Sequence, residues 1–212
     1  VPMKDIVRLH ASSGTTGKRI VEMVKEDLKP SDIMTQAAFE NAIAMDMALG
    51  GSSNTALHIP AIAYELEEKG VHADLDLFDE IRDKVAHIAL LSPAGEDTMA
   101  DLHADGGIPA VLKTIESKLD TSVMTCTGKT LEENLKDAKV TGNGVIHTLD
   151  DPIHEAGGLT VLKGNLAPNG SIVKSAAVPE DMMQLKGPAK VYNSEEDAVE
   201  AIFNHELKEG DI

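Results

Sequence analysis

Apolar residues recur at helical spacing through the first two thirds of the chain. The pattern predicts long helices over 17–29, from a cap at Ser31 or Thr35 to 49, and over 54–69. Shorter helices are predicted over 74–84, on both sides of Gly106-Gly107, and at 130–138, where Thr130 and Glu133 form a capping box. In the segment 54–69 we expect one apolar face to pack inward, made of Leu57, Pro60, Ala61, Ala63 and Tyr64.

The period changes from helical to two near Thr141-Gly142-Asn143-Gly144. Short strands are predicted over 145–149, 159–163, 171–175 and 189–192, and at Val123–Thr125 earlier in the chain. A helix over 195–203, capped by Ser194, follows the last of them. We expect this helix to bury Ala198, Val199, Ala201 and Ile202. The prediction is therefore an α/β chain, helix-rich over residues 1–140, with a second domain that starts at 141 and runs to 212.

Composition narrows the classes of function. Acidic residues outnumber basic ones 36 to 19 among 212 residues, which gives a net charge of −17. Such a surface repels nucleic-acid phosphate and anionic lipid, and no apolar run is long enough for a membrane helix. The single cysteine, Cys126, excludes an internal disulfide framework and fits a reducing compartment. We expect a globular cytoplasmic protein in which Cys126 is a buried apolar residue rather than a nucleophile.

Two glycine-rich junctions are candidates for chemistry. Leu49-Gly50-Gly51-Ser52-Ser53-Asn54 lies at a helix N-terminus, where glycines, free N–H groups and small polar side chains suit a carboxylate or phosphate. The alternative is a tight turn in which Ser53 or Asn54 only caps the helix, and spacing alone favours the turn. His103 before Gly106-Gly107 and His154 before Gly157-Gly158 are similar places where a structural role is the simpler interpretation.

Taken together, these segments resemble the dihydroxy-acid dehydratase family, which includes phosphogluconate and sugar-acid dehydratases. The resemblance covers nearly the whole chain in one order. The matching stretches are Ala38-Phe39-Glu40-Asn41-Ala42, Leu49 to Thr55 with Leu57-His58, Asp101-Leu102-His103-Ala104-Asp105-Gly106-Gly107, Thr127-Gly128-Lys129-Thr130-Leu131, Pro152-Ile153-His154, Gly157-Gly158-Leu159, Leu162 to Pro168, Gly187-Pro188-Ala189-Lys190-Val191 and Ser194-Glu195-Glu196-Asp197-Ala198. Ser53 stands where the family usually has Thr. Thr55 after Asn54 favours the branched-chain amino-acid enzymes over the sugar-acid branches.

The resemblance implies a hydro-lyase that converts a 2,3-dihydroxy carboxylic acid to a 2-keto acid in valine, isoleucine and leucine biosynthesis. It also implies a homodimer, a β-barrel second domain, a 2Fe-2S or 4Fe-4S iron–sulfur cluster and Mg²⁺. We expect the ligands of both cofactors, and the catalytic base, to lie outside this chain, because Cys126 is in none of the family's cluster motifs. The site residues expected here bind substrate, and they are Gly50, Gly51, Ser52, Ser53, Asn54 and His103.

Three alternatives remain open from the sequence. Because Val1-Pro2-Met3 lacks an initiator Met and Gly210-Asp211-Ile212 resembles the start of a strand, we expect the middle of a longer enzyme that is inactive in isolation. The same pattern would fit a segment of a sugar-acid or phosphogluconate dehydratase. It would also fit a separate, non-catalytic binding or assembly module with the same fold.

Overall fold

The structure, a computed structural model, describes residues 3–212, with side chains from residue 13 onward. Val1 and Pro2, which belong to the predicted cut end, lie outside the described residues. The chain divides into two compact units, Val1–Ala177 and Val178–Ile212. Within the described part of the chain, no helix is both long and apolar enough to cross a membrane.

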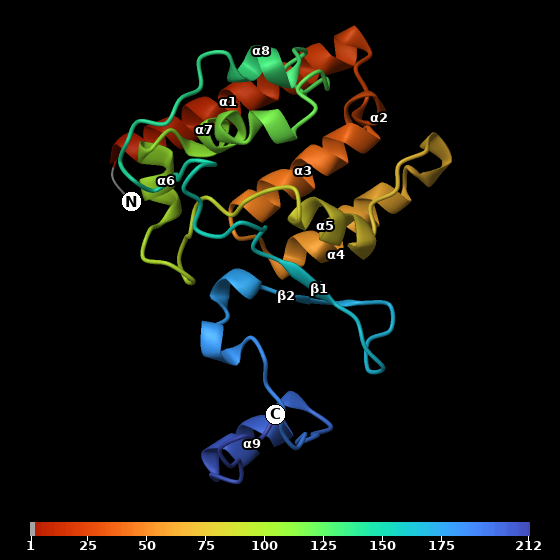
Figure 1. The fold of residues 1–212 in the computed structure, drawn as a ribbon. Coiled ribbons are helices and arrows are strands. Elements are labelled where there is room, and N and C mark those ends of the chain that lie inside the picture. Colours follow the sequence, from red (N-terminus) through yellow and green to blue (C-terminus); the bar gives the residue numbers. More distant parts are fainter. Residues whose placement is uncertain (1–2) are drawn as a thin grey trace. The chain divides into compact units, whose positions relative to one another are not determined.

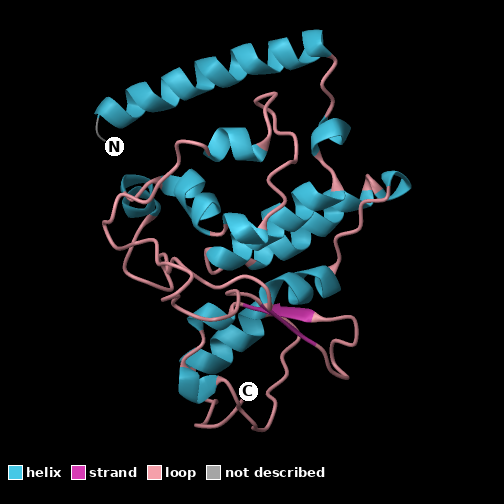
Figure 2. Cartoon of the chain, turned by 45° about the horizontal axis from the view of Figure 1, so that its top comes forward, coloured by secondary structure: helices cyan, strands magenta, loops and turns pink. Residues whose placement is uncertain are grey.

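The first unit consists of helices that follow one another along the chain, with one small sheet near its end (Figure 1, Figure 2). Its helices are α1 (Met3–Glu26), α2 (Pro30–Ile33), α3 (Gln36–Ala48), α4 (Ser53–Tyr64), η1 (Glu67–Lys69), α5 (Leu75–Arg82), α6 (Met99–Ala104), α7 (Gly107–Thr114), η2 (Glu116–Lys118), α8 (Leu131–Leu135) and η3 (Ser175–Ala177). Strands β1 (Thr160–Leu162) and β2 (Ser171–Val173) pair antiparallel, with Thr160 opposite Val173. The predicted helix-rich α/β chain with strands late in the sequence is confirmed.

The core of this unit is centred on α3, which packs against α4, α5 and α7, while α5 also packs against β1. Its fully buried side chains are aliphatic or aromatic and include Ile43, Met47, Phe78, Ile88, Leu102, Val111 and Leu159. Burial of this kind stabilises by about 25 cal/mol for each Å² of apolar surface removed from water. Because most of the buried face of α3 is apolar, its packing holds the C-terminal end of the helix in place, and the glycine-rich junction Leu49 to Asn54 begins there.

Several helix starts follow from local side-chain chemistry. Thr35, Asp74 and Thr130 each accept a hydrogen bond from a first-turn N–H of α3, α5 and α8, so these predicted caps are confirmed. Gly70 takes a left-handed conformation, φ 79°, after η1. A side-chain oxygen at the N-cap satisfies an N–H that has no partner inside the helix.

Two helix predictions are wrong in detail. The helix predicted from 17 starts at Met3 and passes through Gly14 and Gly17, because a helix tolerates a glycine at a cost of about 1 kcal/mol. In α4 the face that was expected to pack inward is largely exposed: Leu57 is 66% exposed to solvent and Tyr64 is 68% exposed. The residues that α4 buries are the small Ala56 and Ala63, which allow it to lie close to its neighbours.

The strand predictions were only partly right. The runs 159–163 and 171–175 contain β1 and β2, but 145–149 forms no strand because the N–H groups of Val145 and Ile146 bond to a carboxylate instead. Val123–Thr125 contributes a single bridge, Met124 with Thr130. The closed barrel of the expected second domain remains a prediction, as does its start at residue 141.

The second unit contains η4 (Glu180–Met182) and α9 (Glu195–Phe203). Ser194 caps α9 as predicted, by accepting from the N–H of Asp197. Of the residues expected to be buried in α9, only Ala201 is, whereas Val199 and Ile202 are exposed. The predicted strand 189–192 is absent, and Lys190 instead donates its N–H to the carbonyl of Ile212.

Candidate functional site

The candidate loop lies between the end of α3 and the start of α4. Gly50 and Gly51 both have left-handed backbones, with φ values of 82° and 68°. Ser52 is the N-cap of α4, and its Oγ accepts hydrogen bonds from the backbone N and the Nδ2 of Asn54 at 3.3 and 3.1 Å. The prediction that Ser53 or Asn54 is the cap is therefore wrong. Both side chains are exposed in the first turn of the helix, where a ligand can reach them, and one N–H of the Asn54 amide is already bonded to Ser52.

The two glycines fit their surroundings too closely to carry side chains. A Cβ built on Gly50 would lie 2.7 Å from Nε2 of His87, and one on Gly51 would lie 2.4 Å from Cγ of Leu159. A Cβ on Gly158 would lie 2.3 Å from the Cα of Gly50. The loop is held between residues that are far away in the sequence.

Backbone hydrogen bonds join the same three regions. The carbonyl of Ala48 accepts from the N–H groups of Ile88 and Ala89, at 2.9 and 3.3 Å. The carbonyl of Met47 accepts from Gly158 at 3.1 Å. The end of α3, the segment after α5 and the segment before β1 therefore form one continuous support for the loop.

Asp46 is a residue of this site that the sequence reasoning did not single out. Its Oδ1 accepts from Oγ1 of Thr55 at 3.0 Å, which ties α3 to α4. Its Oδ2 is buried and has no hydrogen-bond partner among the described residues. Burial raises the pKa of the Asp46 carboxyl, against the opposing effects of the Thr55 hydroxyl, the Ser52 N–H and the charge of Lys174. The sequence does contain one signal for a buried carboxyl here, because Asp46 is the single acidic residue in the apolar run from Ala42 to Leu49.

We expect Asp46→Asn to increase the free energy of unfolding at pH 7 by about 1 kcal/mol, because the buried charge is removed while the acceptor for Thr55 remains. A carboxyl whose pKa is raised on folding favours the folded state when protonated, and this contribution is lost as pH rises through the folded pKa. Chemical denaturation at several pH values measures it, with the exposed Asp79→Asn on α5 as control. Lower stability of Asp46→Asn at pH 7 would contradict the assignment.

A second missed residue is His87, which is fully buried behind Gly50. Its Nδ1 lies 2.8 Å from Nδ1 of His154, and its Nε2 lies 3.0 Å from the carbonyl of Ala89. The two imidazoles stack with centroids 5.1 Å apart and planes 5° apart. Burial lowers the pKa of His87 to about 4, so that its ring is neutral at pH 7. A lone histidine in an apolar run carries no local signal of such a pair.

His103, the sixth predicted site residue, lies at the other glycine junction, between α6 and α7. Its side chain is exposed, and a Cβ on Gly107 would lie 3.7 Å from its Nδ1. No hydrogen bond among the described residues joins His103 to Gly50, Gly51 or Asn54. The structure therefore places Gly50 to Asn54 in one loop and His103 at the second glycine junction, and the role of His103 beside that loop stays a prediction.

The buried residue at that junction is Asp105. Its two carboxylate oxygens accept five hydrogen bonds, at 2.8–3.0 Å, from the hydroxyl of Thr141 and the backbone N–H groups of Gly142, Asn143, Val145 and Ile146. Burial opposes the charged form, but these hydrogen bonds outweigh it and lower the pKa of Asp105 to about 2. Asp105 thus fixes the segment 141–146 to the helical part of the unit.

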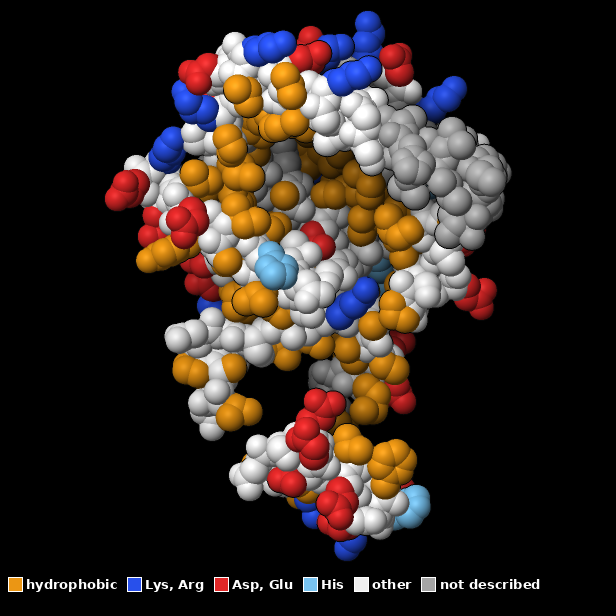
Figure 3. All heavy atoms as spheres, turned by 180° about the vertical axis from the view of Figure 1, so that it is seen from behind, with side chains coloured by type: hydrophobic (Ala, Val, Ile, Leu, Met, Phe, Trp, Pro, Cys, Tyr) orange, Lys and Arg blue, Asp and Glu red, His pale blue; other side chains and the backbone are white. Residues whose placement is uncertain are grey.

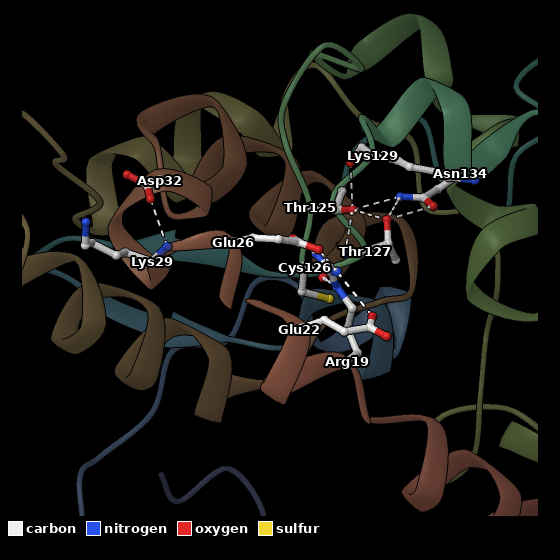
Figure 4. Close-up of polar contacts among 10 residues, drawn as sticks. All are labelled: Arg19, Glu22, Glu26, Lys29, Asp32, Thr125, Cys126, Thr127, Lys129 and Asn134. Atoms are coloured by element: carbon white, nitrogen blue, oxygen red, sulfur yellow. Dashed lines mark hydrogen bonds and ion pairs between the residues drawn. The ribbon is translucent and has the colours of Figure 1, made fainter. Parts of the chain in front are cut away.

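Cys126 lies in a loop that contacts α1 (Figure 4). Its carbonyl accepts from Nε of Arg19 at 2.6 Å, and the same guanidinium binds both carboxylate oxygens of Glu26. The thiol is in an exposed residue, so the prediction that Cys126 is buried is wrong. Among the residues that the structure describes, no three His, Cys, Asp or Glu side chains come together to hold a metal ion.

An open cavity of about 450 Å³ lies between α4, the start of α5 and the hairpin loop that joins β1 and β2. Leu57, Pro60, Leu75 and Asn169 contribute to its lining, and Lys163 there forms an ion pair with Asp76. None of the six predicted site residues lines this cavity. Figure 3 shows one face of the first unit, with a hollow around which hydrophobic side chains gather.

Comparison of the amino-acid sequence with known proteins identifies the family of this chain. Residues 6–134 match the family profile described as "Dihydroxy-acid/6-phosphogluconate dehydratase N-terminal", and residues 144–212 match the corresponding C-terminal profile. The chain is 64% identical over 197 residues to a protein named dihydroxy-acid dehydratase from Methanobrevibacter smithii, and 57% identical to its namesake from Methanothermobacter thermautotrophicus. A namesake from Acetivibrio thermocellus is 50% identical over 198 residues.

These alignments cover 92–93% of the chain but only 35–36% of each relative, so the chain spans about a third of the length of the curated relatives it matches. The two profile matches lie in the order expected from the sequence motifs and together include the glycine loop, His87, Asp105 and the sheet. The chain belongs to the dihydroxy-acid/6-phosphogluconate dehydratase family.

Proposed function

We propose that this chain is a segment of a dihydroxy-acid dehydratase, a hydro-lyase that removes water from a 2,3-dihydroxy carboxylic acid. Loss of the C2 proton and the C3 hydroxyl gives an enol, which becomes the 2-keto acid. The relatives at 64%, 57% and 50% identity carry the dihydroxy-acid dehydratase name, which supports this branch over the phosphogluconate branch.

The observation that carries the role of this chain is the loop Gly50 to Asn54 at the N-terminus of α4. The helix dipole favours an anion at this end of α4. The N–H of Asn54 already bonds to Oγ of Ser52 and that of Thr55 to the carbonyl of Ser52, so the first-turn N–H that a ligand would meet is that of Ser53. Gly50 and Gly51 supply the left-handed backbone that leads into α4, and the exposed Ser53 and Asn54 side chains can donate hydrogen bonds. We assign this loop to the substrate carboxylate. The structure offers no such support for His103, whose place in the same cavity stays a prediction from the sequence.

The iron–sulfur cluster and Mg²⁺ that the resemblance implies would activate the leaving hydroxyl and hold the substrate oxygens. Cys126 is the single cysteine of the sequence, and no three His, Cys, Asp or Glu side chains come together among the described residues, so we name no ligand of either group in this chain. We therefore assign no step of the reaction in this chain to a cofactor. A homodimer, a cytoplasmic location and a role in branched-chain amino-acid synthesis belong to the same proposal and rest on the resemblance.

Exposed apolar side chains on two helices agree with a segment of a larger protein. On α1, Ile20, Val21 and Val24 are exposed, and on α4 Leu57 and Tyr64 are. Contiguous exposed apolar surface usually marks an interface.

The proposal is tested by assaying the full-length protein that contains this chain for 2-keto acid formation, detected as a hydrazone. We expect a higher kcat/KM with 2,3-dihydroxy-3-methylbutanoate than with 6-phosphogluconate. A higher kcat/KM with 6-phosphogluconate would contradict the proposal and show that the chain is a segment of a phosphogluconate dehydratase. Absence of product from both substrates, with cofactors loaded, would favour the non-catalytic module.

A further inference from the structure

His87 holds a fixed place behind the glycine loop through its backbone. Its N–H donates to the carbonyl of His154 at 3.0 Å, and its carbonyl accepts from the N–H of Ile153 at 2.9 Å. The next residue, Ile88, donates to the carbonyl of Ala48 at the end of α3, at 2.9 Å. The residue is thus anchored both to the segment before β1 and to the helix from which the loop emerges.

The ring of His87 has one consistent arrangement of protons. Nε2 lies 3.0 Å from the carbonyl of Ala89, which can only accept, so Nε2 carries the proton. In the neutral ring Nδ1 is then an acceptor, and Nδ1 of His154, at 2.8 Å, must donate to it. Both nitrogens of a fully buried side chain are therefore satisfied, as a buried polar group requires.

The edge of this ring contacts the loop. A Cβ on Gly50 would come within 2.7 Å of Nε2, while on the other side a Cβ on Gly158 would come within 2.3 Å of the Cα of Gly50. Gly50 is consequently confined between the imidazole and the backbone of Gly158. A shift of the ring would move Gly50 and with it Gly51, Ser52 and the first turn of α4.

We propose that His87 is a positioning residue of the substrate loop, whose doubly hydrogen-bonded imidazole fixes Gly50 and thereby the anion-binding end of α4. The inference rests on the proposed function, because the loop must contact substrate for its position to matter. It makes no claim that His87 touches the substrate.

Charged and titratable neighbours reinforce one state of the ring. His154, Lys174 and His147 all oppose a positive charge on His87. The positive charge of Lys174 also lowers the pKa of Asp46, the acidic residue at the end of α3. Protonation of His87 would make its Nδ1 a donor, so the neutral ring of His154 would have to carry its proton on Nε2 and accept at Nδ1, which reverses the hydrogen bond between the two rings.

The test uses His87→Phe, which keeps a buried ring without hydrogen bonds, and His154→Phe, which removes the donor from an exposed position and leaves the core intact. The exposed His72→Phe is the matched control. In the full-length protein, we expect the backbone amides of residues 48–55 to exchange at least about fivefold faster in His87→Phe and in His154→Phe than in the wild type. A fivefold change corresponds to the loss of one hydrogen bond. The control should match the wild type.

Two further measurements separate positioning from general structure. The Cε1–H signal of His87 should titrate near pH 4 in the wild type and at a higher pH in His154→Phe. KM for the dihydroxy acid should rise several-fold in His154→Phe with a smaller change in kcat, because the loop holds a carboxylate that does not react.

Unchanged exchange of residues 48–55 in a folded His154→Phe protein would overturn the proposal, even if His87→Phe failed to fold. Faster exchange together with unchanged KM would support the positioning role and contradict the assignment of the loop to substrate. Failure of this inference and failure of the proposed function are thus distinguishable.

Discussion

Replacing Gly51 by alanine is expected to destabilise the protein by about 3 kcal/mol and to abolish most of the activity of the full-length enzyme. A left-handed backbone costs a residue with a Cβ about 1 kcal/mol, and overpacking a filled core costs a further 1–3 kcal/mol. Both apply here, because φ is 68° and the new Cβ would lie 2.4 Å from Cγ of the fully buried Leu159. The midpoint of chemical denaturation and the rate of keto acid formation measure the two effects.

The chain offers a matched control for this substitution. Gly70 has a similar backbone, φ 79°, but a Cβ there would meet nothing within 4 Å. Gly70→Ala should therefore show only the conformational cost, about 1 kcal/mol, and leave activity unchanged. Equal losses for Gly51→Ala and Gly70→Ala would show that the close packing of the loop against Leu159 has no energetic consequence.

The second large effect is expected for Asp105→Asn, which should cost about 3 kcal/mol or more of stability. The amide group would turn an NH₂ toward two backbone N–H donors that now bond to a carboxylate oxygen, leaving buried donors opposed. We expect the segment 141–146 to detach from the junction of α6 and α7. Limited proteolysis within 141–146 and thermal unfolding report this, with the exposed Asp137→Asn as control.

Acid pH provides an independent check on Asp105. Its pKa falls from 3.8 to about 2 on folding, so the carboxylate stabilises the protein above pH 3.8. That contribution is lost as pH falls through the folded pKa, because the unfolded chain binds the proton first. The wild type should lose stability more steeply between pH 4 and 2 than Asp105→Asn does, and parallel curves would contradict the assignment.

Local chemistry made the helices predictable from the sequence. Apolar spacing identified α3, α5 and α9, and Thr35, Asp74, Thr130 and Ser194 capped their helices as expected. These features depend on residues within one or two turns of each other. The start of α1 was missed because the helix was predicted to begin at Gly17, although a long helix can contain Gly14 and Gly17 in its interior.

Features set by tertiary contacts could not be predicted in the same way. The run Val145–Leu149 has the alternation of a strand, but Asp105, some 40 positions earlier, takes its N–H groups. The apolar residues Leu57 and Tyr64 suggested an inward face on α4, whereas the close packing of the helix selects the small Ala56 and Ala63.

The candidate site shows the same division. The loop Gly50 to Asn54 was visible from glycines and small polar residues between two helices, although its cap is Ser52. Its supports, His87, His154 and Gly158, lie between about 35 and 110 residues away in the sequence. His154 and Gly158 belong to stretches that match the family, but no local pattern shows that any of the three packs against the loop. Asp46 is close in sequence, but its buried, unpartnered oxygen is a property of the packing of α3 against α4.

The central claim is that the N-terminal turn of α4 binds the substrate carboxylate, and the kinetics of Ser53→Ala and Asn54→Ala in the full-length enzyme test it most directly. Both side chains are exposed, so the fold should be preserved. Loss of one hydrogen bond to a charged group is worth about 1.5–3 kcal/mol, which predicts a fall in kcat/KM of roughly 10- to 100-fold for each variant, with unchanged thermal stability. Wild-type kcat/KM in both variants would contradict the claim and reduce the loop to a turn between two helices.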